Sequence, residues 1–173
     1  MKLGGFWIGW AFCGYLSVVV AGAALLHYLR RMPRFFSVLS LPGTLAHEML
    51  HFLLGTLTLA QPVKFSLLPK FHRDGSATLG YVTFNNIRWY NALWVGMAPM
   101  LALPVSLWLV YYRSMQSAPS AIQEAAWSYV SASLLYSCLP SKADIAIVWS
   151  KPVGLIVYLA SGVMLYWMRF TSS

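Results

Sequence analysis

Two histidines and a glutamate lie close together in the apolar sequence LAHEMLH, residues 45–51. Residues four apart on an α-helix project from the same face, so His47 and His51 would lie one turn apart on one side of the helix. Two imidazoles placed in this way can bind one zinc ion. Glu48 is rotated by about 100° from His47, which places its carboxylate beside such a metal rather than on it.

The spacing matches H-E-x-x-H, the signature of zinc hydrolases, in which the metal lowers the pKa of water and the glutamate is the general base. The surrounding residues favour this interpretation, because polar and charged side chains are costly and uncommon inside a membrane. The alternative is a buried polar cluster that only ties helices together, although one polar residue usually suffices for that role. We therefore expect His47 and His51 to be metal ligands and Glu48 to be catalytic.

A catalytic zinc site usually has three protein ligands and a water molecule, so a third ligand is needed. His27 lies near the end of an apolar run and His72 lies in a predicted turn, and we expect both at the membrane interface. Asp144 is the better candidate, because it follows Pro140 at the broken end of an apolar segment, where an acidic residue is costly. Its alternative role is the N-cap of the next helix.

The composition is that of a membrane protein. Of the 173 residues, 59% are hydrophobic and only 9% are charged, which is far from the composition of soluble globular domains. We expect an integral, multi-pass membrane protein whose surface contacts the lipid bilayer. The net charge of +8 comes mostly from connecting segments, and no basic stripe alternates with aromatic residues, so a nucleic-acid partner is not expected.

Apolar runs of about 20 residues, enough for a helix to cross a membrane, recur along the chain. We predict an all-α membrane protein with a single domain over residues 1–173. Its architecture is a polytopic bundle of about five transmembrane helices. Prolines interrupt the second and third of these helices and end the fourth, where we expect kinks or breaks. The expected spans are about 6–29, 35–60, 92–112, 122–139 and 153–168.

The segment between the second and third spans has a different composition. PVKFSLLP and ATLGYVTF are strand-like, and HRDG between them supplies turn residues. We predict a small membrane-associated β-hairpin over about residues 62–86. Its backbone must be covered by protein or border a water-filled cavity, because unpaired backbone groups are not tolerated in lipid.

The sequence resembles the site-2 protease class of intramembrane zinc metallopeptidases. The resemblance rests on LAHEMLH in one span and on LPSKAD, residues 139–144, about a hundred residues later. The hairpin and the sequence GMAP, residues 96–99, are similar to the family in order and position. Where the family usually has an Asn-Pro or Leu-Asp-Gly context, this chain has Pro-Ser-Lys-Ala-Asp.

The resemblance implies that His47, His51 and Asp144 bind one Zn²⁺ per chain and that Glu48 activates the zinc-bound water. The implied substrate is a transmembrane segment of another membrane protein, which is cut within or near the bilayer. The competing function is a non-catalytic membrane protein that binds or transports a divalent metal with the same ligands.

The hairpin also suggests how a substrate could be held. A substrate helix must unwind before its carbonyl can reach the metal, and an exposed strand edge can pair with the extended segment. The alternative is a strand that simply covers the active-site helices. The residues that we expect to form this edge are Leu79, Gly80, Tyr81, Val82 and Thr83.

Overall fold

The computed structural model describes residues 2–3, 6–7, 9–71, 77–116 and 120–171, most of which are helical. The helices are α1 (Trp10–Leu29), α2 (Pro33–Leu39), α3 (Leu41–Leu57), α4 (Ala92–Gly96), the 3₁₀ helix η1 (Ala98–Leu101), α5 (Ala102–Ser114), α6 (Ala121–Ser137), α7 (Lys142–Trp149) and α8 (Pro152–Thr171). The strands are β1 (Lys2–Leu3), β2 (Phe6–Trp7), β3 (Pro62–Ser66), β4 (Lys70–Phe71), β5 (Ala77–Thr78) and β6 (Tyr81–Phe84).

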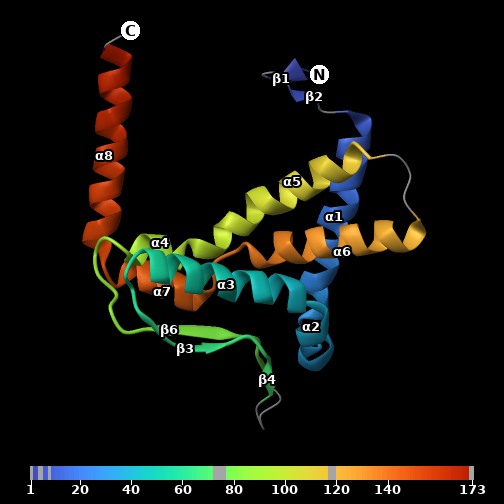
Figure 1. Cartoon of the computed structure of the whole chain (residues 1–173), viewed down its shortest axis with the longest axis horizontal. Helices are drawn as coiled ribbons and strands as arrows, with labels where there is room; N and C mark the ends of the chain where they lie inside the picture. The colour runs from blue at the N-terminus through green and yellow to red at the C-terminus, as the bar shows by residue number, and fades with distance from the viewer. Residues whose placement is uncertain (1, 4–5, 8, 72–76, 117–119, 172–173) are drawn as a thin grey trace.

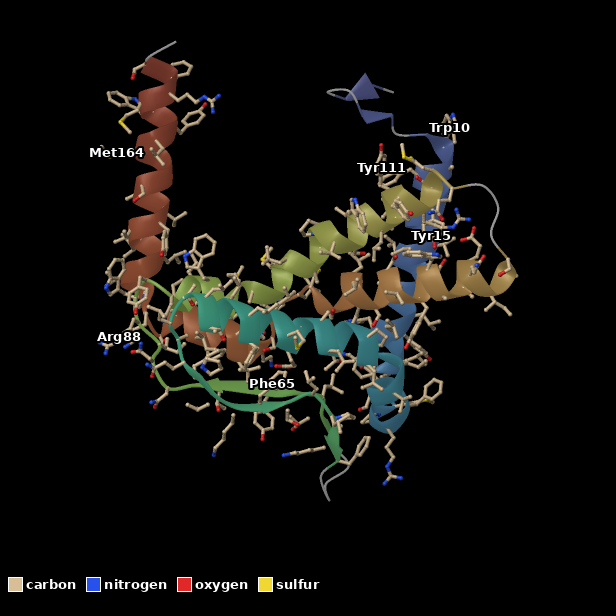
Figure 2. All side chains as sticks on the ribbon, in the orientation of Figure 1. Trp10, Tyr15, Phe65, Arg88, Tyr111 and Met164 are labelled. Atoms are coloured by element: carbon tan, nitrogen blue, oxygen red, sulfur yellow. The ribbon has the colours of Figure 1, made fainter. Side chains whose placement is uncertain are left out.

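The predicted β-hairpin is present. Strand β3 pairs with β6 in antiparallel register, with Phe65 opposite Val82, and β4 pairs with β5 nearer the tip. The expected turn residues 72–75 lie outside the described part of the chain. The hairpin lies along α3 (Figure 1), and the rings of Phe65 and Phe52 pack with their centroids 5.1 Å apart between the two elements (Figure 2).

Helix α3 is the centre of the fold. It packs against α6 and η1 on one side and against the hairpin on the other. A buried cluster of Ala102, Leu134 and Cys138 joins α5 to the end of α6, and Leu50 of α3 packs against it. A second cluster, Val19, Val110 and Ala132, joins α1, α5 and α6.

The expected bundle of about five transmembrane helices is not what the structure shows. Among the described helices, only α1 and α8 are long and apolar enough to cross a membrane, with mean hydropathies of 1.7 and 1.5 over their best windows. These two helices also run across the direction of α3 and α6 instead of parallel to them (Figure 1). The fold is therefore mostly helical, but it is not a bundle of five parallel, full-length spans.

Prolines account for much of this difference. The second expected span, 35–60, is divided into α2 and α3 just before Pro42, because a proline supplies no N–H and disfavours the helical conformation of the preceding residue. The third, 92–112, consists of α4, η1 and α5, with the change of helix type at Pro99. The fourth ends at Ser137, before Pro140, and α7 follows as a separate helix.

The start of α3 is held by a direct contact with α6. Gly43 occupies the first turn, where a backbone N–H has no partner within its own helix, and this N–H donates to Ser133 Oγ at 2.8 Å. A Cβ on Gly43 would collide with the backbone carbonyl of Ser133. Glycine is therefore required for α3 and α6 to approach so closely.

The turn between α3 and β3 contains two residues in the left-handed region, Leu59 with φ 61° and Gln61 with φ 55°. This conformation is unfavourable for residues other than glycine. Two asparagine side chains stabilise the turn: Asn86 Nδ2 donates to Leu59 O at 2.9 Å, and the fully buried Asn91 donates to Thr58 O at 3.2 Å. These bonds direct the hairpin back beneath α3.

The Gly43 contact predicts a specific loss of stability. Gly43→Ala should destabilise the protein by about 1–3 kcal/mol, the usual range for overpacking, because the new methyl group meets the backbone of α6. Gly14→Ala is the matched control, since a Cβ on Gly14 of α1 has no atom within 4 Å and alanine favours a helix over glycine. Thermal unfolding in one detergent measures both variants, and equal melting temperatures would contradict the close contact.

Candidate metal centre

Helix α3 brings His47 and His51 together as the sequence predicts. Their ring centroids are 4.8 Å apart, and His51 Nε2 lies 3.2 Å from His47 Nε2. His51 is 3% exposed, and the side chain of His47 is 14% exposed. Both Nε2 atoms therefore face one small space inside the fold.

Asp144 approaches this space from α7. Its Oδ1 lies 3.0 Å from His51 Nε2, and its Oδ2 lies 3.3 Å from His47 Nε2. Asp144 is not the N-cap of α7, which was the alternative role; the N-cap is Ser141. The carboxylate completes a capping box from the third position of the helix, because Oδ2 accepts the Ser141 N–H at 2.6 Å and Ser141 Oγ accepts the Asp144 N–H at 3.2 Å. This box fixes the orientation of the carboxylate toward the histidines.

Gly96 allows α7 to come this close. A Cβ at this position would lie 2.6 Å from the carbonyl oxygen of Asp144 and 2.5 Å from a methyl group of Val148. A larger residue at position 96 would push α7 away from α4 and displace Asp144 from the histidines. The glycine of GMAP thus has a structural role in assembling the cluster.

Each histidine is oriented by a backbone carbonyl. His47 Nδ1 donates to Ser137 O at 2.8 Å, and His51 Nδ1 donates to Val95 O at 2.9 Å. A carbonyl oxygen only accepts, so both Nδ1 atoms carry a proton. In the neutral imidazoles, both Nε2 atoms then present lone pairs to each other and to a carboxylate, an arrangement that a cation between them would stabilise.

The three side chains fit a tetrahedral metal. Ligand atoms about 2.0 Å from a zinc ion in tetrahedral geometry are about 3.3 Å from one another. The two Nε2 atoms are 3.2 Å apart, and each lies near a different oxygen of Asp144, at 3.0 and 3.3 Å, so these closest separations approach the tetrahedral value. Three protein ligands leave one position for water, as in catalytic rather than structural zinc sites.

Glu48 lies beside this cluster and does not join it. Its carboxylate is 8% exposed and makes no hydrogen bond or ion pair with any residue that the structure describes. The hairpin lies against it, since a Cβ on Gly80 would be only 2.7 Å from Glu48 Cγ. A buried carboxylate held by packing and without a donor is placed to accept a proton from a bound molecule.

A cavity of about 600 Å³ contains the site. It is lined by His47, Glu48, His51 and Asp144, by the break between α6 and α7, and by Leu79, Gly80, Tyr81 and Val82 of the hairpin. Thr83, the fifth residue of the expected edge, is exposed and does not line the cavity. The expected strand edge therefore borders the cavity over four of its five residues.

His27 contributes no atom to the cluster. His27 of α1 lines the same cavity, and its ring packs near Tyr136 with centroids 6.3 Å apart. His72 lies outside the described residues. Sequence reasoning missed the two carbonyls that orient the histidines, on Val95 and Ser137, because the type of a residue carries no information about its backbone carbonyl.

Comparisons with other proteins assign no family to the chain. No protein-family model, curated protein or solved structure matches it. The geometry of the cluster, the neighbouring glutamate and the cavity are therefore the observations from which a function must be argued.

Proposed function

We propose that the protein is an intramembrane zinc metalloprotease that resembles the site-2 protease class and hydrolyses peptide bonds in transmembrane segments of other proteins. The observation that carries the proposal is the convergence of His47, His51 and Asp144, whose ligand atoms lie within 4.8 Å of one another, with Glu48 beside them in a cavity. A purely structural polar cluster has no need for a second buried carboxylate without a donor.

The chemistry follows from the positions of the side chains. His47, His51 and Asp144 would hold one zinc ion per chain. The bound ion would act as a Lewis acid, which lowers the pKa of water and polarises a peptide carbonyl. Glu48 takes a proton from the attacking water as the new bond forms between the water oxygen and the carbonyl carbon. It then returns this proton to the nitrogen as the peptide C–N bond breaks. The capping box holds the Asp144 carboxylate in position through both steps.

The surface of the helices supports a location in the membrane with more than the two long helices inserted. Large apolar side chains are exposed on α3 and α5 as well as on α1 and α8, including Leu53 of α3 and Trp108 of α5. Figure 2 shows that α8, which carries Met164, stands clear of the rest of the fold along most of its length. Lipid solvates such surfaces at no cost, whereas water does not. We therefore propose a multi-pass protein whose interrupted helices lie within the bilayer.

Strand β6 and the residues before it are proposed to hold the substrate. Among the described strands, β6 pairs only with β3, so its second edge is open to an extended peptide. Leu79, Gly80, Tyr81 and Val82 line the cavity that contains Glu48. A substrate paired with this edge would pass beside the metal ligands in an unwound conformation.

Metal content tests the ligand set. The purified protein should hold about one zinc per chain, while His47→Ala and Asp144→Ala should lose it and Glu48→Gln should keep it, because Glu48 is not a ligand. Elemental analysis of the detergent-purified protein measures the content. His27→Ala is the control, since His27 lines the same cavity without joining the cluster. A parent protein without zinc after reconstitution would refute the proposal.

Replacement of the general base tests for catalysis. Glu48→Gln should reduce hydrolysis by about a hundredfold to ten-thousandfold, the usual contribution of general acid–base catalysis, with its zinc content unchanged. A quenched fluorescent peptide with an apolar, helix-destabilised segment measures the rate in detergent micelles. Equal, background rates for the parent and the variant would instead favour a protein that binds or transports the metal without catalysis.

The position of the hairpin gives an independent prediction. Gly80→Val should retain zinc but lose about a hundredfold in hydrolysis, a loss typical of a 1 Å displacement at a reacting centre, because the new side chain displaces Glu48 or the strand. Gly162→Val on α8 is the control, as a Cβ there meets no atom within 4 Å. The same fluorescent assay applies, and full activity of Gly80→Val would place the substrate elsewhere.

A further inference from the structure

The backbone carbonyls that orient the two histidines lie at two helix breaks. One break is between α4 and η1, and the other is between α6 and α7. Val95 O, which accepts from His51 Nδ1 at 2.9 Å, belongs to the last turn of α4, three residues before the start of η1. Ser137 O, which accepts from His47 Nδ1 at 2.8 Å, is the last residue of α6. In an uninterrupted helix, such carbonyls would accept from the N–H four residues later.

At the first break, that N–H does not exist. The residue four positions after Val95 is Pro99, which is fully buried and has no backbone N–H to donate. The carbonyl of Val95 is thus deprived of its helical donor, and the imidazole of His51 donates to it. The ring of His51 is held with Nε2 directed toward His47 and Asp144.

At the second break, the carbonyl of Ser137 also lacks its helical donors, but for a different reason. Pro140, three residues after Ser137, cannot provide the donor of a final 3₁₀ turn. The next N–H, that of Ser141, donates to Asp144 Oδ2 at 2.6 Å. Both helical donors of the Ser137 carbonyl are therefore removed, one by a proline and one by the third metal ligand, and His47 takes their place.

We propose that Pro99 and Pro140 are positioning residues of the metal centre. Each withholds an N–H that would compete for a carbonyl, so that the carbonyl fixes one histidine in the Nδ1–H tautomer and leaves Nε2 for the metal. Pro99 acts on His51, and Pro140 acts on His47. This inference rests on the metal site of the proposed function, but it concerns hydrogen bonds that exist without the metal.

The tautomers of the two histidines provide a direct test. The chain has four histidines, so selective nitrogen-15 labelling gives few signals, which His47→Ala and His51→Ala assign. In the metal-free parent at about pH 9, well above the ordinary pKa of histidine, both should carry the proton on Nδ1. Nε2–H in the parent for either residue would overturn the proposal without the need for a proline variant.

The variants should separate the two histidines. Pro99→Val, which restores an N–H while retaining bulk, should move His51 away from a pure Nδ1–H state and leave His47 unchanged. Pro140→Val should do the reverse. Pro99→Ala repeats the first test with a smaller side chain. An equal response of both histidines to one variant, or no response in folded protein, would show that the prolines only interrupt the helices.

Zinc affinity provides the second measurement, by competition with a chromophoric chelator. Pro99→Val and Pro140→Val should each weaken zinc binding by about tenfold to a hundredfold, the usual effect of removing a partner that orients a ligand. Pro104→Ala is the matched control, because Pro104 is an exposed proline of α5 with no ligand-orienting carbonyl four residues before it. Unchanged affinity in the first two variants would overturn the proposal. A protein with proline-dependent tautomers that cleaves no peptide would disprove the protease function alone.

Discussion

The convergence of two imidazole nitrogens and a carboxylate in an apolar interior is the interaction on which the rest of this structure depends. The Nε2 atoms of His47 and His51 are 3.2 Å apart, and each lies 3.0–3.3 Å from one oxygen of Asp144. Lone pairs and negative charge at such distances repel one another unless a proton or a metal ion lies between them, and little solvent is present to weaken the repulsion. The fold must supply both the hydrogen-bond partners that orient these groups and the rigidity that keeps them together.

Glycine provides the close approaches that this rigidity requires. Gly43 brings α3 onto α6, Gly96 brings α7 onto α4, and Gly80 brings the hairpin onto Glu48. Each contact joins a segment that supplies the cluster or its neighbouring base, α3 or α7, to a segment packed against it. The site is therefore assembled from several short elements pressed together, and small residues are needed wherever their backbones meet.

The parts of this site that are visible in the sequence are those set by local spacing. His47, Glu48 and His51 were predictable because four-residue spacing fixes a helical face, and the hairpin was predictable from the strand-like composition of its two segments and the turn residues between them. The turn at Leu59 and Gln61 was not, since its left-handed residues are stabilised by Asn86 and Asn91, about 30 residues away in sequence. Hydropathy also predicted about five spans, with breaks at the prolines, but it did not show that among the described helices only α1 and α8 are long and apolar enough to cross a membrane.

In this fold, the carbonyls freed by the proline breaks and the N–H groups of the buried histidines are hydrogen-bonded to each other. A proline inside an apolar helix leaves a carbonyl without its donor, and a buried imidazole has an N–H without an acceptor; each alone would be costly in the absence of water. Here the Val95 carbonyl accepts from His51 and the Ser137 carbonyl accepts from His47, so both carbonyls and both imidazole N–H groups have partners. The break at Pro140 also starts α7, whose capping box delivers Asp144. In a straight helix at either position, the carbonyl would bond to a backbone N–H and the imidazole would lack an acceptor. The arrangement of the two histidines therefore depends on the interrupted helices.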